Sequence, residues 1–304
     1  MTIEPTTATC AGARVDATAQ RHTQRVSKPG AERGIVLLAV LWMVAALSLV
    51  VVGMVNATRQ ETRRTGQTRQ TLAGVTQIDA ALHLALQQLK TKPAPQTQLS
   101  FIDTLFDGQS IRVQVQPLNG FIDLNNAPRD LLVALFIHAG KMDRAAAEAL
   151  VTNLVVLRSR KDARGSPIGF EAVEDLLGVP GVDYALYASI KNFVTTDVRS
   201  SGRVNALAAP VGVLTVLADG NAQKAATIAA GRDAGAVGVD TTALNPAFVD
   251  GSATQRVQLQ AALRLPDGST LVYRRSVDLS PSAREGTPWR TFRAEHWVEP
   301  AAPQ

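Results

Sequence analysis

The sequence predicts an α+β fold in which a long N-terminal helix packs on an antiparallel sheet, with a large all-helical module inserted into that sheet. Three observations predict it. The run Ile35–Val55 is apolar and contains neither a charge nor a proline. Apolar residues at helical spacing continue this run to Lys90. Runs with strand-like alternation stand before and after residues 122–235, whose own apolar pattern is helical.

The run Ile35–Val55 has the length of a membrane-spanning helix. At about 1.5 Å per residue it crosses a hydrocarbon core of about 30 Å. The apolar core of a cleaved secretory signal is shorter, about 7–15 residues. A buried helix of a soluble protein is the alternative interpretation. We expect residues 35–55 to lie in the bilayer, with the short N-terminal side inside and the folded body exported.

Residues 1–34 are expected to be a leader that is removed. Residues 1–27 are rich in Thr, Ala and Gln and lack apolar periodicity. The single cysteine of the chain, Cys10, lies in this leader. The mature body is therefore expected to hold neither a disulfide nor a reactive thiol, and its hydrophobic core must stabilise it.

Residues 56–91 are expected to continue the same helix outside the membrane. They contain neither a proline nor a strong turn signal, and Lys92-Pro93 ends the pattern. One apolar stripe at helical spacing predicts that this half packs on the sheet. The stripe consists of Leu72, Val75, Ile78, Leu82, Leu86 and Leu89.

Residues 100–121 and 236–299 are expected to form the sheet. Apolar and polar side chains alternate in several runs there, and Asp267-Gly268 between two of them predicts a hairpin. The expected strands are Ser110–Gln116, Arg256–Leu265, Ser269–Asp278 and Thr291–Val298, and residues 300–304 are a tail.

Residues 122–235 predict the helical insert. Asn125 or Asn126 is expected to cap its first helix, with Pro128 in the first turn. The segment Val204–Pro210 again places an Asn and then a Pro ahead of an apolar helix, so it resembles the segment that begins at Ile122. Further helices are expected over 145–157, 170–177 and 185–193, followed by an alanine-rich linker that contains Gly231, Gly235 and Gly238.

A tight turn in this insert is formed by Gly178, Pro180 and Gly181. It resembles the hairpin of helix-hairpin-helix or SAM-like modules. Helix-hairpin-helix modules bind nucleic-acid phosphates through backbone N–H groups. The alternative function is therefore a competence or DNA-uptake minor pilin, or a membrane-anchored DNA-binding protein. Acidic residues around the turn, namely Glu171, Glu174, Asp175 and Asp183, repel phosphate, so no nucleic acid is expected.

The junction Arg33-Gly34-Ile35 resembles the class III leader of type IV pilins and pseudopilins. In that family a prepilin peptidase cuts after the glycine, which here implies cleavage between Gly34 and Ile35. The order of four blocks resembles the minor pseudopilins of the protein K family in type II secretion systems. These blocks are Arg33–Val50, Asn119–Leu135, Gly169–Val182 and Gly202–Leu217.

The resemblance implies a place at the tip of a short periplasmic pseudopilus. Most pseudopilins carry a glutamate at the fifth mature position, which is thought to pair with the subunit above. The fifth residue after cleavage here is Ala39, which cannot ionise. The implied partners are the minor pseudopilins I and J and the other pseudopilins, the prepilin peptidase, inner-membrane lipid, and also the secretin and the secreted substrates. The implied location is the bacterial inner membrane, crossed once, with the C-terminal body in the periplasm.

We expect neither enzymatic activity nor a cofactor. The four histidines are scattered, and the sequence contains neither a nucleophile elbow nor a phosphate-binding loop. Relatives in the family bind calcium through an acidic run, and at the aligned positions Val156–Asp162 only Arg158 and Asp162 keep the character of that run. Residues that could supply calcium ligands are Asp162, Glu171, Glu174 and Asp175.

Overall fold

The computed structural model describes residues 32–91, 96–165, 167–196, 201–236, 238–280 and 288–301. Helix α1 covers Glu32–Thr91, but the side chains of residues 32–35, 53 and 55–65 lie outside the description. Two compact units meet within α1, the first ending at Arg64 and the second covering Thr65–Gln304. Each unit is described by itself below.

In the first unit, the described side chains of α1 are exposed and mostly apolar. Leu37 is 76% exposed and Leu49 is 74% exposed. No stretch of helix whose residues are described is both long and apolar enough to span a bilayer. The expected membrane segment, Ile35–Val55, includes side chains outside the description and remains a prediction.

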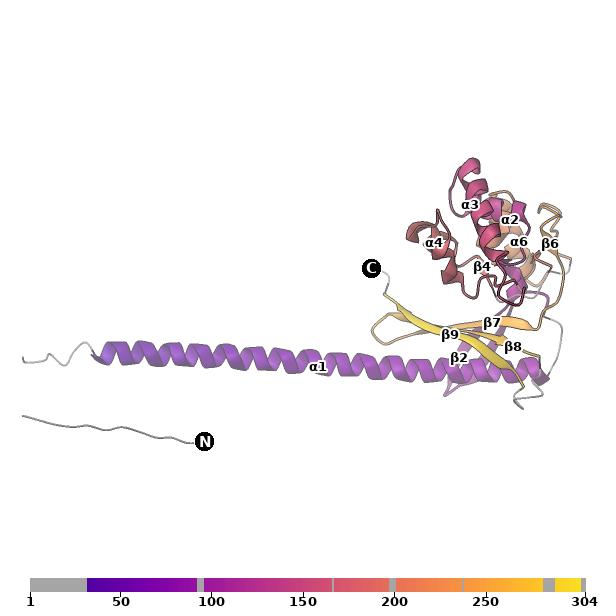
Figure 1. Cartoon of the computed structure of the whole chain (residues 1–304). Helices are drawn as coiled ribbons and strands as arrows, with labels where there is room; N and C mark the ends of the chain where they lie inside the picture. The colour runs from indigo at the N-terminus through magenta and orange to yellow at the C-terminus, as the bar shows by residue number, and fades with distance from the viewer. Residues whose placement is uncertain are drawn as a thin grey trace, which may run out of the picture. The chain divides into compact units, whose positions relative to one another are not determined.

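In the second unit, the C-terminal part of α1 packs on one face of a five-stranded antiparallel sheet, as predicted (Figure 1). Ile78, Leu82 and Leu86 are fully buried there, whereas Leu72 is exposed. Gly74 faces the sheet, and a Cβ at this position would lie 3.0 Å from the side chain of Leu271. Glycine in the helix therefore allows close approach of helix and sheet.

The sheet has the strand order β1-β2-β7-β8-β9, and the helical insert lies between β2 and β7 in the sequence. The hairpin with Asp267 and Gly268 in its turn is formed as predicted, and Gly268 has a positive φ of 84°. The strands are β1 (Ser100–Phe106), β2 (Gln109–Pro117), β7 (Arg256–Arg264), β8 (Thr270–Asp278) and β9 (Arg290–Glu299).

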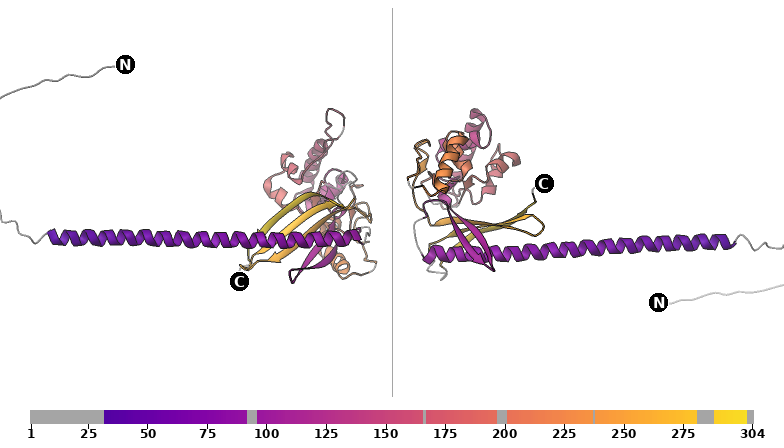
Figure 2. Two further views of the ribbon diagram at one scale, coloured as in Figure 1. Left: turned by 90° about the horizontal axis from the view of Figure 1, so that it is seen from below. Right: turned by 180° about the vertical axis from the view of Figure 1, so that it is seen from behind.

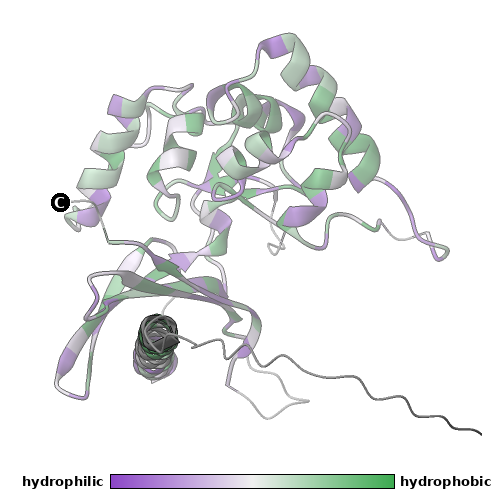
Figure 3. Ribbon diagram, turned by 90° about the vertical axis from the view of Figure 1, so that its left-hand side faces the viewer, coloured by the Kyte–Doolittle hydropathy of each residue, from purple (hydrophilic) through white to green (hydrophobic). Residues whose placement is uncertain are grey.

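The insert lies on the face of the sheet opposite to α1 (Figures 2 and 3). Its core is separate from the core under the sheet and is built around fully buried residues such as Leu132 and Phe136. Its helices are α2 (Arg129–His138), α3 (Arg144–Arg158), α4 (Tyr184–Ile190), α5 (Val211–Leu217) and α6 (Ala222–Asp233), with 3-10 turns η1 (Leu118–Gly120) and η2 (Val173–Gly178).

The start of the insert differs from the sequence expectation. Pro128 is the N-cap residue of α2 and not part of its first turn. Neither Asn125 nor Asn126 caps the helix, because the Asn125 side chain exchanges two hydrogen bonds with the backbone of Phe170 and the Asn126 side chain donates to Asp123. The Asp123 carboxylate accepts hydrogen bonds from the Asn125 backbone N–H at 2.9 Å and from Asn126 Nδ2 at 2.6 Å. An aspartate two residues upstream thus forms an Asx turn that the local pattern did not reveal.

The end of the insert differs as well. The stretch interpreted as a flexible linker contains helix α6, in which Gly231 is an interior residue. The helical core continues to Leu244 and Phe248, beyond the expected limit of 235. The expected helix over 170–177 is the 3-10 turn η2.

The insert consists of two similar halves, and the two segments that resemble each other in sequence, from Ile122 and from Val204, lie at their starts. The first begins with β3 (Ile122–Asp123) and the second with β5 (Val204–Asn205). Each of these short strands pairs in parallel with the short strand that ends its half, β4 (Val194–Thr195) and β6 (Val249–Asp250) respectively. In each half a proline is the N-cap of the next helix, Pro128 for α2 and Pro210 for α5.

Two arginines at the ends of corresponding helices stabilise these turns. Arg158, the last residue of α3, donates to the carbonyl of Ala127 at 2.9 Å. Arg232, near the end of α6, donates to the carbonyl of Ala209 at 2.6 Å. Each accepting residue directly precedes the capping proline of its half. The two halves therefore share a strand, two helices and an arginine hydrogen bond, and the first half adds η2 and α4 before its last strand.

The two halves contact each other through two glycines in a reciprocal arrangement. A Cβ on Gly120, just before the first half, would lie 2.2 Å from the carbonyl oxygen of Ala208 in the second. A Cβ on Gly202, just before the second half, would lie 1.9 Å from the carbonyl oxygen of Asn126 in the first. Backbone approaches backbone at both places, so only glycine fits.

Candidate functional site

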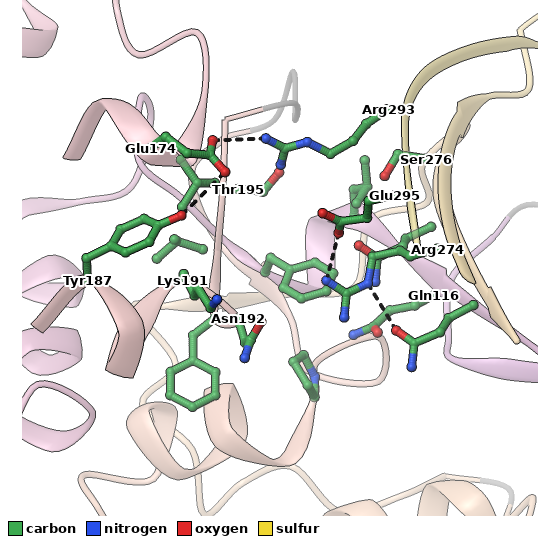
Figure 4. A pocket seen from close by; sticks show the side chains of 18 residues that line it. Gln116, Glu174, Tyr187, Lys191, Asn192, Thr195, Arg274, Ser276, Arg293 and Glu295 are labelled. Atoms are coloured by element: carbon green, nitrogen blue, oxygen red, sulfur yellow. Dashed lines mark hydrogen bonds and ion pairs between the residues drawn. The ribbon is translucent and has the colours of Figure 1, made fainter. Parts of the chain in front are cut away.

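A polar cleft of about 310 Å³ lies between the insert and the outer face of the sheet (Figure 4). Its insert side is formed by η2, α4 and β4, and its sheet side by β2, β7, β8 and β9. The labelled lining residues are Gln116, Glu174, Tyr187, Lys191, Asn192, Thr195, Arg274, Ser276, Arg293 and Glu295.

One side-chain network bridges the cleft. Arg293 of β9 donates to Glu174 of η2 at 3.1 Å. The Tyr187 hydroxyl donates to the other carboxylate oxygen of Glu174 at 3.3 Å. Burial, followed by the nearby charge of Glu174, raises the pKa of Tyr187 above its usual value. At neutral pH the tyrosine is therefore a hydrogen-bond donor that orients Glu174 toward the sheet.

A second network belongs to the sheet alone. Arg274 of β8 donates to Glu295 at 3.1 Å and to Gln260 at 3.0 Å. Its guanidinium also lies over the Trp297 ring, 4.9 Å from the ring centre. Phe121 and Leu118 pack against Phe292 where the insert leaves the sheet. The Arg293–Glu174 pair and the packing on Phe292 thus hold the insert against β9, while the Arg274 network orders the sheet side of the cleft.

The cleft has the composition of a contact surface. Neither His nor Cys is among its lining residues, and the carboxylates Glu174 and Glu295 are each paired with an arginine. General-base and nucleophilic catalysis need an available base next to a nucleophile. The side chains of this cleft instead form neutralised pairs between two parts of one chain.

Three of the four candidate calcium ligands, Asp162, Glu174 and Asp175, accept hydrogen bonds through their carboxylates. Asp162 accepts from the Arg164 backbone N–H at 2.8 Å. Asp175 accepts from the backbone N–H groups of Glu171 and Ala172 at 2.8 and 2.9 Å. Among the described residues, no cluster of three acidic, His or Cys side chains has the geometry of a metal site.

The turn at Gly178, Pro180 and Gly181 is a structural element of the insert core. The carbonyl of Pro180 accepts from Asn153 of α3 at 3.1 Å. Gly181 has a φ of +100°, and a Cβ there would lie 2.9 Å from a methyl group of Leu150. Asp183 caps α4 by accepting from the Leu186 N–H at 2.7 Å. The chain's own carboxylate therefore occupies the helix terminus that a phosphate would need.

The expected processing site lies outside the described side chains. Gly34 and Ile35 are within α1, but only their backbone is described. Ala39 is described and is exposed. Its place at the fifth mature position depends on cleavage after Gly34, which stays a prediction.

Sequence reasoning missed Asp123, which is 2% exposed. Burial raises its pKa above the usual value, although hydrogen bonds from Asn126 and Asn125 and the charge of Arg158 act in the opposite direction. The corresponding residue of the second half is Asn205, whose side-chain oxygen accepts from the Leu207 N–H at 3.1 Å. A neutral amide therefore performs in one half the role that a carboxyl group performs in the other.

Asp123→Asn is expected to raise the free energy of unfolding at neutral pH relative to the original chain. A carboxyl group whose pKa is raised on folding binds its proton more tightly in the folded state, so its stabilising effect is lost as pH rises through the folded pKa. The gain from the amide is expected to vanish at about pH 3 and below, where the carboxyl group is mostly protonated in both states. Urea unfolding at pH 3 and pH 7 measures the difference.

Asp103→Asn is the control for this prediction, with the opposite sign. The hydrogen bond from Arg112 lowers the pKa of Asp103, so this carboxylate stabilises the fold above its unfolded pKa. Its amide variant is expected to be less stable than the original chain at pH 7, and this difference is expected to shrink at pH 3, as the pH falls toward the lowered pKa of the folded state. Equal pH responses of the two variants would contradict the assignment for Asp123.

Comparison with known proteins finds a structural similarity. No family model and no curated protein matches the chain. A solved structure does. The chain is similar to a chain of the GspK-GspI-GspJ complex from the enterotoxigenic Escherichia coli type 2 secretion system, with 16% identity and a TM-score of 0.46. The match covers 78% of this chain and 99% of that chain.

Proposed function

We propose that this chain is a non-enzymatic minor pseudopilin, anchored in the bacterial inner membrane, that acts at the tip of a type II secretion pseudopilus. In this role it initiates assembly with minor pseudopilins equivalent to I and J and thereby serves protein export across the outer membrane. The proposal includes cleavage after Gly34 by a prepilin peptidase, and contacts with the secretin and with secreted substrates.

The observation that carries the proposal is the change of character along helix α1. Its C-terminal part buries one stripe, including Ile78 and Leu82, against the sheet. The described part of its N-terminal half exposes large apolar side chains, among them Leu37, Trp42 and Leu49, and directly follows Arg33-Gly34 in the sequence. Exposed apolar surface of this extent needs lipid or a partner to cover it.

The position of the insert supports a place at the tip. The insert covers the face of the sheet opposite to α1, so it adds bulk beside the sheet. A module in this place would obstruct a further subunit stacked above, whereas the tip leaves it free. Ala39 supports the same place, because a subunit without a buried carboxylate needs no partner above it. We also propose that the insert is related to SAM-like modules. Calcium binding is not part of the proposed function.

N-terminal sequencing of the full-length protein extracted from membranes tests the proposal. The expected N-terminus is Ile35 in cells with the prepilin peptidase, and the uncleaved leader in cells without it. Replacement of Gly34 by leucine is expected to block cleavage in the first strain, with Gly66→Leu as a control substitution elsewhere in α1. A start at Met1 or at any residue other than Ile35 in the presence of the peptidase would refute the proposal.

A further inference from the structure

The sheet has two edge strands of opposite character. In the part of the chain that the structure describes, β1 pairs only with β2, and β9 pairs only with β8. Strand β9 carries charges of both signs at Arg290, Arg293, Glu295 and Glu299. Charged residues on an edge strand are a common protection against pairing with other chains. Strand β9 is therefore a protected edge.

Strand β1 lacks this protection. Its sequence is SFIDTLF, seven residues with the single charge of Asp103. That charge is neutralised within the sheet, because Arg112 of β2 donates two hydrogen bonds to the Asp103 carboxylate, at 2.8 and 3.1 Å. All seven residues are paired in register with β2. The opposite side of β1 thus offers an ordered row of backbone groups without net charge.

The side chains of β1 add an apolar surface next to this edge. Ile102 packs against the core under α1, and the alternation of a strand places Phe101 and Leu105 on the other face. Phe101 is 48% exposed and Leu105 is 72% exposed. They lie on either side of the Asp103–Arg112 pair along the strand. Exposed apolar side chains next to an unprotected edge are typical of an interaction surface.

We propose that the free edge of β1 pairs with an edge strand of a neighbouring pilin-fold subunit. The matching strand has apolar side chains opposite Phe101 and Leu105 and an uncharged or basic residue opposite Asp103. This inference rests on the proposed function, which supplies the neighbouring subunit. A second copy of the chain fits less well, because antiparallel pairing of two β1 strands about their centre places two Asp103 carboxylates opposite each other, and each exposed Arg112 compensates only the carboxylate of its own sheet.

Co-purification tests the proposal. The full-length chain is produced with the other minor pseudopilins of its own secretion system, extracted in detergent, and the recovered partner subunits are quantified. The double variant Phe101→Lys, Leu105→Lys is expected to reduce partner recovery about tenfold or more, because pairing would bury unpaired ammonium groups. Val298→Lys, on the protected edge β9, is the matched control and is expected to leave recovery unchanged.

The outcomes separate this inference from the proposed function. Undiminished recovery with the double variant, or an equal loss with Val298→Lys, would overturn the pairing through β1. Absence of partners with the original chain would refute the proposed function and this inference with it. A dimer of the chain alone that the double variant abolishes would overturn the choice of partner. Thermal unfolding is expected to be nearly unchanged in all variants, because the substituted side chains are exposed.

Discussion

Gly202→Ala is expected to destabilise the insert by about 3 kcal/mol or more, the largest effect of a single methyl group in this protein. A Cβ at this position would lie 1.9 Å from the carbonyl oxygen of Asn126, and the glycine has a φ of +80°. Both the clash and the backbone strain act against alanine, and the colliding atom is backbone, so no side chain can rotate away. The contact between the two halves must open to admit the methyl group.

Urea unfolding combined with hydrogen exchange by mass spectrometry measures this effect and locates it. Loss of protection is expected in both halves of the insert, because Gly202 precedes one half and contacts the other. Gly120→Ala is expected to act similarly through Ala208, at 2.2 Å. Gly178→Ala is the control, since nothing lies within 4 Å of a Cβ there, and a change within about 0.5 kcal/mol is expected. Equal stability of the Gly202 and Gly178 variants would contradict the reciprocal contact.

Arg232→Met is expected to cost about 2 kcal/mol, and Arg158→Met a similar amount. The Arg232 side chain is only 3% exposed, and methionine keeps its apolar bulk while removing the donor. The carbonyl of Ala209 would then lose its side-chain partner inside the core, which destabilises more than the hydrogen bond itself stabilises. In the first half, Arg158→Met would leave the carbonyls of Leu124 and Ala127 without their arginine donor.

Chemical denaturation of the two single variants and of the double variant tests this prediction. The costs are expected to add within about 0.5 kcal/mol if each arginine stabilises its own half, and to deviate if the halves are coupled through the glycine contacts. Arg164→Met in an exposed loop is the control and is expected to be neutral. Neutral results for both arginine variants would contradict this prediction, because they would mean that water replaces the guanidinium groups without loss.

The local sequence pattern was sufficient to predict the strands that pack on the core under α1. The alternation in Ser110–Gln116 predicted β2, and the Asp267-Gly268 turn predicted the hairpin of β7 and β8. Local pattern was not sufficient where a distant residue decides the conformation. Asn125 and Asn126 are good capping residues, yet the Asn125 side chain exchanges hydrogen bonds with the distant backbone of Phe170 and Asn126 binds Asp123, so the helix begins only after Pro128. The alanine-rich stretch around Gly231 forms a helix because Ile228 and Arg232 find partners in the other elements of the insert.

The candidate site shows the same division. Gly178, Pro180 and Gly181 could be recognised as a turn, because their backbone preferences are local. The pairing of Glu174 with Arg293 could not be recognised, because the two residues are far apart in sequence and either charge alone suits an exposed surface. Asp123 was missed for a related reason: only burial by both halves of the insert changes the behaviour of its carboxyl group.

The sequence by itself determined that a long helix precedes a sheet, that one of its stripes is apolar, and that a helical module interrupts the strands. These features are periodicities of 3.6 and 2 residues, which a chain carries wherever it folds. Only the tertiary structure decided that the module is two similar halves joined through Gly120 and Gly202, that it covers the outer face of the sheet, and that β1 is the unprotected edge. Those features depend on which surfaces come into contact. Contacts between residues that are far apart in sequence produce no periodic pattern of apolar residues, so the sequence alone does not predict them.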